Sequence, residues 1–261
     1  MPRIPELVCD LPEEVPFLDE WIKKERADWL ADEIKYEKEY MQGTEKISPL
    51  EKLTFAAASD RFDDADEIMD KQGWTGASKP DINNSRTLMF HACDGNSKFH
   101  KMMYYKLLLY LADRDPACVV SRFDGETMLH TTFSGAENPV VIKELLSRGA
   151  NPYATNQDKK TYLEVLEAEF LEKFPGGILP DDAALREKLS PCVQQWNSLD
   201  DLVVDARKRY ENYQTIISMV KNFMDVHKED KCAEREALIA QTSAKSHVGR
   251  VAGTSHGWLS H

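Results

Sequence analysis

Residues 124–163 read DGETMLHTTFSGAENPVVIKELLSRGANPYATNQDKKTYL, and this stretch decides the fold. Its marks, in chain order, are a turn-forming Asp124-Gly125, Thr127, a Leu129-His130 pair, an apolar run over 140–146 and a Gly149-Ala150-Asn151 turn. The pattern restarts at Thr161, 34 residues after Thr127. Self-similarity at a fixed period of about 20–50 residues is the signature of a repeat architecture. We therefore expect a solenoid of stacked helical units.

The same marks occur less completely elsewhere in the chain. Residues 87–93 read TLMFHAC, and residues 48–73 carry two consecutive helix patterns that end at Gly73. These motifs resemble the ankyrin repeat, a unit of about 33 residues with a T-P-L-H-x-A signature. The resemblance covers roughly residues 48–165. It implies an all-α fold: a short ankyrin-repeat solenoid of three to four repeats, with a helical N-terminal cap and a helical C-terminal extension.

Within the third repeat, which begins at Asp124, the marked residues have structural explanations. Gly125 permits a tight turn, and the Thr127 hydroxyl can cap the helix that follows. Gly149 can end a helix in a left-handed conformation. In the family, the histidine at the position of His130 hydrogen-bonds to neighbouring backbone. We interpret His130 as such a structural residue, and not as a catalyst or a metal ligand.

The flanking segments predict further helices, which divide the chain into four parts. Residues 1–47 form an N-terminal helical cap, 48–165 the ankyrin-repeat domain, 166–240 a C-terminal helical extension and 241–261 a disordered tail. The amphipathic helix expected at 17–41 covers the end of the solenoid on this interpretation, because terminal repeats need a polar cover. A partner-binding helix is the alternative.

Two C-terminal helices are predicted after residue 180. The first spans 181–196 and is kinked or ended early by Pro191. The second spans 198–227 and carries an apolar stripe: Leu202, Ala206, Tyr210, Tyr213, Ile217, Val220 and Met224. This stripe can pack on the solenoid, pair with the first helix, or form a coiled-coil dimer.

Composition limits the function classes. The chain has 261 residues and a formal net charge of −12. This acidic balance argues against nucleic-acid binding, which needs lysine and arginine to neutralise phosphates. Its five cysteines are odd in number and form no C-x-x-C, so neither a disulfide framework nor a zinc site is indicated. We find no signal peptide and no membrane-spanning run, and we expect a cytoplasmic or nuclear protein without membrane contact.

In ankyrin proteins the turn tips and the exposed side of the inner helices line a concave groove that binds other proteins. Carried over by position, the partner-binding candidates are Asn84, Arg86, Leu88, His91, Asp94, Phe123, Asp124, Glu126, Met128, Thr131, Ser134, Asp158, Lys160 and Tyr162. Mixed aromatic, methionine and acidic side chains suit a protein-binding face. For any single one of these residues, an ordinary solvated surface is the alternative.

The sequence contains no convincing catalytic or metal-binding pattern. GTSHG at 253–257 fits the G-x-S-x-G nucleophile elbow, but no acid follows Ser255, and we treat the match as coincidence. No two histidines have the H-x-x-x-H spacing of a helical metal site. The resemblance implies a non-enzymatic, cofactor-free protein–protein interaction module: an adaptor, scaffold or regulatory subunit. The alternatives are an acidic chaperone or inhibitor that shields a basic partner, and an enzyme with its site in the C-terminal helices.

Overall fold

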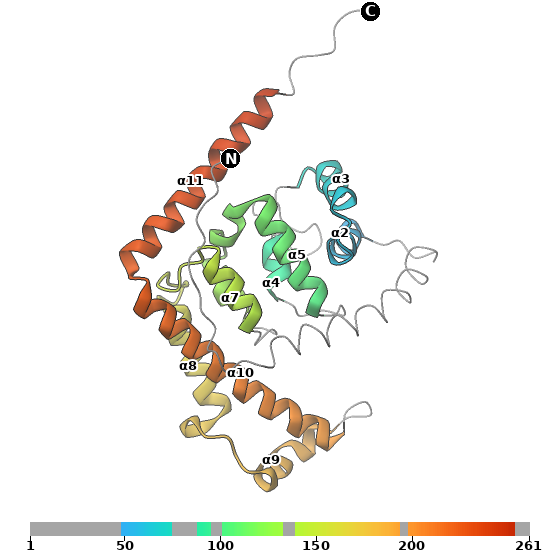
Figure 1. The fold of residues 1–261 in the computed structure, drawn as a ribbon. Helices are drawn as coiled ribbons and strands as arrows, with labels where there is room; N and C mark the ends of the chain where they lie inside the picture. The colour runs from blue at the N-terminus through green and yellow to red at the C-terminus, as the bar shows by residue number, and fades with distance from the viewer. Residues whose placement is uncertain (1–47, 75–87, 95–100, 133–138, 194–197, 254–261) are drawn as a thin grey trace, which may run out of the picture.

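The computed structural model describes residues 48–74, 88–94, 101–132, 139–193 and 198–253. These residues are mostly helical, which confirms the all-α prediction (Figure 1). The helix predicted at 17–41 lies outside the described residues, as does the whole of the N-terminal cap. None of the described helices combines the length and the apolar character that a bilayer crossing requires.

Three consecutive helix pairs form the body of the molecule. The pairs are α2 (Pro49–Ala58) with α3 (Phe62–Gln72), α4 (Leu88–Asp94) with α5 (Lys101–Arg114), and α6 (Met128–Thr131) with α7 (Pro139–Ser147). Neighbouring pairs stack, because α2 contacts α5 and α4 contacts α6. The core lies between the stacked pairs and contains the fully buried Leu53, Leu88, Met89, Leu107, Leu108, Leu111, Met128 and Leu129. Each such side chain contributes about 1.5–3 kcal/mol relative to leaving it exposed.

Local signals set the ends of the first pair as predicted. The Ser48 hydroxyl accepts a hydrogen bond from the Glu51 amide at 3.2 Å, and the Glu51 carboxylate accepts one from the Ser48 amide at 2.8 Å. This reciprocal capping box satisfies two donors at the start of α2. Gly73 ends α3 with φ +62°, in the left-handed region that glycine adopts without strain.

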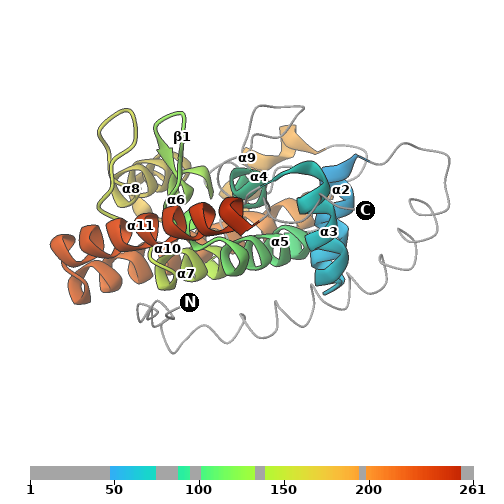
Figure 2. The same ribbon diagram turned by 90° about the horizontal axis from the view of Figure 1, so that it is seen from above.

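Two narrow loops project from the same side of the body and lie side by side (Figure 2). The first finger, residues 122–127, is a hairpin of β1 (Arg122–Phe123) and β2 (Glu126–Thr127), joined at Asp124-Gly125. The second finger, residues 154–161, is closed by a bridge between Thr155 and Thr161. The Arg122 guanidinium donates to the Thr155 carbonyl oxygen at 2.7 Å and ties the fingers together.

The C-terminal helices extend the stack. They are α8 (Tyr162–Lys173), the short 3₁₀ turn η3 (Pro175–Gly177), α9 (Asp182–Leu189), the 3₁₀ turn η4 (Ser190–Cys192), α10 (Leu199–Val226) and α11 (Glu229–Gly253). The α8 helix contacts α6, and α10 contacts α7, α8 and α9. Pro191 lies in η4, so α9 ends early as predicted. The domain boundary expected at 165/166 falls inside α8, and the extension continues the body without a break in structure.

The face that α10 buries differs from the predicted stripe. Tyr213 and Val220 are buried as predicted, but the other buried positions are Val203, Ile216, Met219 and Phe223. Five stripe members remain only half-buried: Leu202, Ala206, Tyr210, Ile217 and Met224. The buried face is shifted because α10 packs against α7, α8 and α9, and a single stripe cannot serve all three neighbours.

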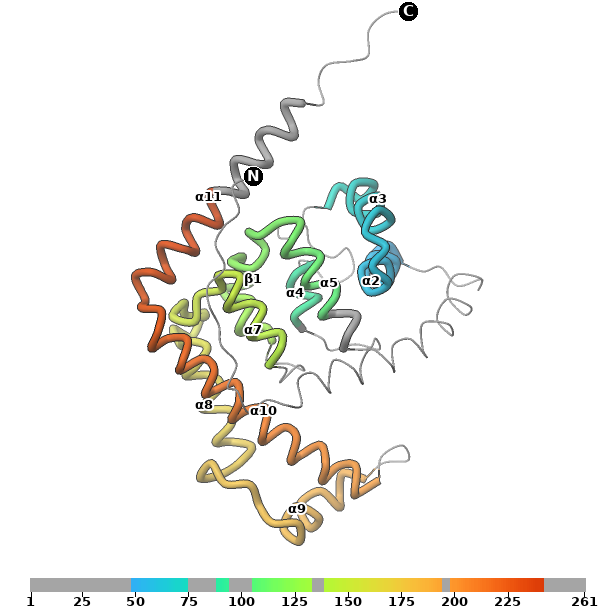
Figure 3. The backbone as a smooth tube through the Cα atoms, viewed as in Figure 1, coloured from blue at the N-terminus to red at the C-terminus, as the bar shows by residue number. Residues whose placement is uncertain are grey.

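The last helix corrects the prediction for the tail. The backbone is helical to Gly253, where disorder was expected from residue 241 onward. Between α10 and α11 the chain turns a sharp corner at residues 227–228 (Figure 3). Beyond this corner α11 packs on the 3₁₀ helix η1 (Pro116–Val120), which connects α5 to the first finger.

Candidate protein-binding surface

The first finger is positioned by the start of α6. Thr127 is the N-cap of this helix, and its hydroxyl oxygen accepts from the His130 amide at 3.4 Å. The same hydroxyl lies 2.8 Å from His130 Nδ1, and His130 Nε2 lies 3.2 Å from the Lys160 carbonyl oxygen. A carbonyl can only accept, so Nε2 carries the proton and Nδ1 accepts from Thr127. His130 therefore links α6 to the second finger and is structural, as predicted.

Burial favours the neutral form of the His130 ring. Its side chain is buried, and burial lowers the pKa of the ring below its ordinary value. The hydrogen bond to Lys160 opposes this shift but does not reverse it. A neutral ring that uses both nitrogens in the frame is unavailable for proton transfer.

The second finger is stabilised by hydrogen bonds within the loop itself. The Asn156 side-chain oxygen accepts from the amides of Asp158 and Lys160 at 3.0 and 3.1 Å. Thr161 then caps α8, and Glu164 completes a capping box. Gly125 of the first finger packs here: a Cβ on it would lie 3.0 Å from the Cβ of Gln157, and its φ is +79°. The close approach of the fingers and the turn both require glycine at this position.

Seven of the predicted partner-binding residues retain some exposure. Asp124, Asp158 and Lys160 are exposed at the finger tips, and His91, Phe123, Glu126 and Thr131 are half-buried. Phe123 packs on Phe90, with ring centroids 5.0 Å apart. Asn84, Arg86 and Ser134 lie outside the described residues, as does the side chain of Asp94.

Three predicted surface residues are in the core, and the exposure expected for them is wrong. Leu88 and Met128 are 0% exposed, and Tyr162 is 2% exposed. Each follows a threonine at the start of a helix, and its side chain turns into the stack instead of toward the groove. Tyr162 makes an edge contact with the His130 ring, with centroids 6.0 Å apart. Burial raises the pKa of Tyr162, so its phenol stays protonated.

The charges on the fingers are balanced. The acidic residues are Asp124, Glu126 and Asp158, and the basic ones are Arg122, Lys159 and Lys160, so three charges of each sign sum to zero. Burial raises the pKa of Glu126, and the nearby charge of Asp158 adds to this shift. Arg122 and Lys159 were missed in the sequence analysis, although both belong to the finger segments that the motif delimits.

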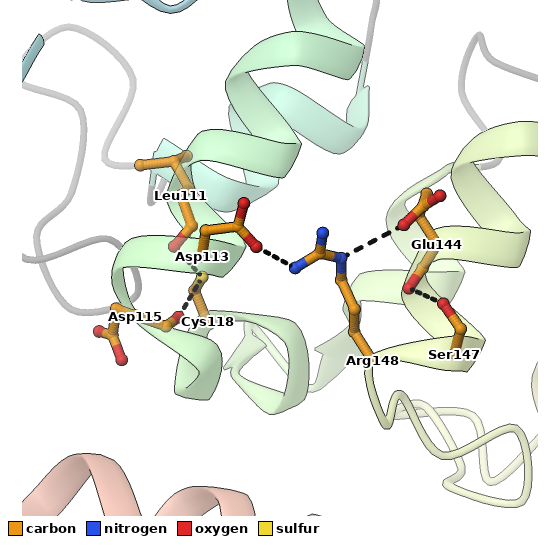
Figure 4. A network of polar contacts seen from close by, with 7 residues as sticks. All are labelled: Leu111, Asp113, Asp115, Cys118, Glu144, Ser147 and Arg148. Carbon is orange, nitrogen blue, oxygen red and sulfur yellow. Dashed lines mark hydrogen bonds and ion pairs between the residues drawn. The ribbon is translucent and has the colours of Figure 1, made fainter. Parts of the chain in front are cut away.

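Arg148 ties together α5 and α7, two of the helices that support the fingers. Its guanidinium, from the end of α7, donates to Asp113 of α5 and to Glu144 of its own helix (Figure 4). Beside it the Cys118 thiol donates to the Asp115 carbonyl oxygen at 2.7 Å. Burial raises the pKa of Cys118, and burial raises the pKa of Cys93 to about 12. Both thiols are protonated at neutral pH and are therefore poor nucleophiles.

Within the ranges that the structure describes, no three His, Cys, Asp or Glu side chains are grouped so that they could hold a metal ion. What the fingers offer is a set of exposed charged and amide groups on a rigid frame. Comparison of the chain with protein-family models, with curated proteins and with solved structures found no match.

Proposed function

We propose that this chain is an ankyrin-type protein-recognition module, and that it serves as an adaptor, scaffold or regulatory subunit. Its binding surface is the finger surface, which consists of Arg122, Phe123, Asp124, Glu126, Thr131, Asp158, Lys159 and Lys160. The observation that carries the proposal is the pair of parallel fingers, each followed by a threonine-capped helix. Such a regular array of turn tips is the form in which ankyrin repeats present a groove to a partner.

The period of the contacts supports the repeat assignment. Arg122 reaches the Thr155 carbonyl 33 residues further along the chain, and His130 reaches the Lys160 carbonyl 30 residues further. In both contacts the acceptor is a backbone carbonyl of the second unit, so neither contact depends on which side chain that residue carries. Both separations are close to the repeat length of about 33 residues, which supports the proposal that the third repeat stacks on the fourth.

The chemistry of the finger surface favours a protein partner. Its charges are of both signs, and the aromatic ring of Phe123 is half-exposed beside them. Protein interfaces combine aromatic anchors with a polar rim, whereas a nucleic-acid site needs a positive excess. The fingers are also fixed by hydrogen bonds before binding, which lowers the entropic cost of association.

An acidic chaperone or inhibitor is the alternative function. It would need a surface with an excess of negative charge. Residues 48–74 contain seven acidic and three basic residues, whereas the fingers are balanced. On this segment, however, Asp66 and Asp70 pair with Arg114, and Asp60 pairs with Lys106. A shielding function would use this acidic end and would weaken steeply with salt. Raising salt from about 0.1 to 1 M shortens the Debye length from about 10 to 3 Å.

A finger variant in which two acidic side chains are replaced by neutral ones tests the proposal. Asp124→Asn and Asp158→Asn remove two exposed charges, and asparagine tolerates the positive φ of +50° at position 124. The matched control is Glu172→Gln with Glu187→Gln, which removes two exposed carboxylates on α8 and α9. Both variants are compared with the parent by affinity capture and then by titration of the captured partner.

We expect the finger variant to bind at least about tenfold more weakly, and the control variant to bind like the parent. Circular dichroism and unfolding curves check that both variants keep the fold. Undiminished binding by the finger variant, with loss of binding in the control, would place the site on the C-terminal helices instead. Affinity that collapses in high salt, with both variants unaffected, would favour the acidic-shield alternative.

A further inference from the structure

The corner between α10 and α11 is not encoded by its own residues. The α10 helix ends at Val226 and α11 begins at Glu229, so only His227 and Lys228 lie between them. The sequence across the corner, 225–230, is DVHKED and contains neither glycine nor proline. Glycine at the end of a helix and proline shortly beyond it are common stop signals, and this corner has neither. The backbone nevertheless breaks, with His227 at φ −112° and ψ 101°.

Tertiary contacts from one short segment hold this corner. The Tyr153 hydroxyl lies 2.7 Å from the Met224 carbonyl oxygen and 3.2 Å from that of His227, at the end of α10. Two residues earlier, the Asn151 side-chain amide donates to the Glu236 carboxylate of α11 at 2.9 Å. The break therefore depends on the contacts that α10 and α11 make with residues 149–153.

The seat of α11 is specific in shape. We define the seat as η1 together with residues 149–153. Cys232 and Ile239, two turns apart on α11, are 2% and 1% exposed. Ile239 lies directly over Gly149, since a Cβ there would come within 2.4 Å of its Cδ1 atom. One face of α11 thus fits a notch that only a glycine leaves open.

We infer that α11 exchanges between two copies of this chain, each copy placing its α11 in the seat of the other. The only change needed within each copy is at residues 227–228, where α10 and α11 join into one helix. The contacts between α11 and the seat are then the same as before, because the occupant has the same sequence. The Tyr153 contact with the His227 carbonyl, which depends on the bend, is given up. Short hinge loops favour domain swapping, which is a low-cost route to a dimer.

The geometry of the straight form makes a second copy necessary. A continuous helix over 199–253 has 55 residues and, at 1.5 Å per residue, a length of about 80 Å. Its α11 half then points away from the body and cannot reach its own seat. The joined helix also regains hydrogen bonds for the amides at the start of α11, which lack intrahelical partners in the bent form.

A disulfide trap distinguishes the two arrangements. Asn151→Cys and Glu236→Cys replace a contacting pair in the full chain. Two further substitutions are made: Cys192→Ser removes an exposed thiol, and Cys9→Ser removes the cysteine that lies outside the described residues. The protein is refolded at high concentration, oxidised and run on a non-reducing gel. A docked helix from the same copy gives an intrachain disulfide, whereas an exchanged helix gives a covalent dimer. We expect the covalent dimer.

Two hinge variants of the trapped protein make the test directional. Glu229→Pro is compatible with the first position of α11 in the bent form but costs about 3 kcal/mol inside a continuous helix. It should abolish the covalent dimer and leave the intrachain disulfide. His227→Ala with Lys228→Ala raises helix propensity and should increase the dimer fraction. Intrachain disulfide alone in the parent and in the alanine variant would overturn the inference, and so would a dimer that persists with Glu229→Pro.

Discussion

Gly149 is the position where one methyl group should have the largest measurable effect. Its φ of +103° is a conformation that side-chain-bearing residues rarely adopt, and the space above it is filled by Ile239. Gly149→Ala therefore perturbs both the turn that follows α7 and the seat of α11. The contacting atom is the end of a flexible side chain, so Ile239 can give way, but only by leaving its preferred rotamer.

The magnitude follows from three terms. Placing a Cβ at a positive φ costs about 1–3 kcal/mol. Forcing Ile239 off its rotamer costs about 0.5–1.5 kcal/mol. Alanine also lowers the conformational entropy of the unfolded chain, which offsets about 0.4–1 kcal/mol of the destabilisation. We expect Gly149→Ala to lower the free energy of unfolding by about 0.5–4 kcal/mol.

Urea unfolding measures this loss, and two further variants separate its causes. Gly73→Ala is the matched control, since φ is +62° there and nothing lies within 4 Å of the added methyl. Ile239→Val removes the Cδ1 atom, so Gly149→Ala should cost about 0.5–1.5 kcal/mol less in that background than in the parent. The Cys232 thiol lies on the buried face of α11, and burial raises its pKa to about 11; it should react faster with a thiol reagent in Gly149→Ala. If Gly149→Ala costs no more than Gly73→Ala and adds independently to Ile239→Val, then Ile239 does not occupy the notch.

Three other perturbations test the frame behind the fingers. Because burial holds the pKa of His130 below its ordinary value, the unfolded chain takes up the proton first. The neutral ring therefore contributes fully to the free energy of unfolding above about pH 6.5, and this contribution is lost as the pH falls through the folded-state pKa. Urea unfolding midpoints measured from pH 7 to 5 should fall more steeply for the parent than for His130→Gln. Arg148→Met should lower the free energy of unfolding by about 1–3 kcal/mol, because the half-buried Glu144 loses its ion-pair partner. Arg148→Lys should lower it less. Equal stability of the parent and both variants would show that the Arg148 ion pairs do not stabilise the fold. Thr161→Ala removes the N-cap of α8 and should lower the free energy of unfolding by about 1 kcal/mol. Thr161→Ser keeps the hydroxyl and should retain most of the parent's stability, and thermal unfolding measures both effects.

Local signals predicted much of the fold, because capping and turn chemistry act over a few residues. The capping box at Ser48, the glycine end of α3 at Gly73 and the early end of α9 before Pro191 were all readable in this way. Each depends on an interaction between residues at most four apart. The sequence pattern needed only the right residue types in the right order.

The long-range features could not be read from local patterns. The face that α10 buries depends on the three helices that it contacts, α7, α8 and α9, whereas the predicted stripe assumed a single neighbour. The break before Glu229 has no local breaker, because Tyr153 and Asn151 hold the corner from more than 70 residues away. Contacts at such separation leave no periodic signature in either segment.

The exposure of the candidate site residues was predicted in part, and the errors share one cause. Met128 and Tyr162 were assigned to the groove by position in a motif, but the repeat uses them for its own core. The residues that make a repeat recognisable are those that it needs for folding, so they are the least available for a partner. What the motif leaves undetermined is the set of side chains at the finger tips, among them Asp124, Asp158 and Lys160. If the fingers bind a protein, specificity must reside in these residues, because the remainder of each unit is committed to holding them in place.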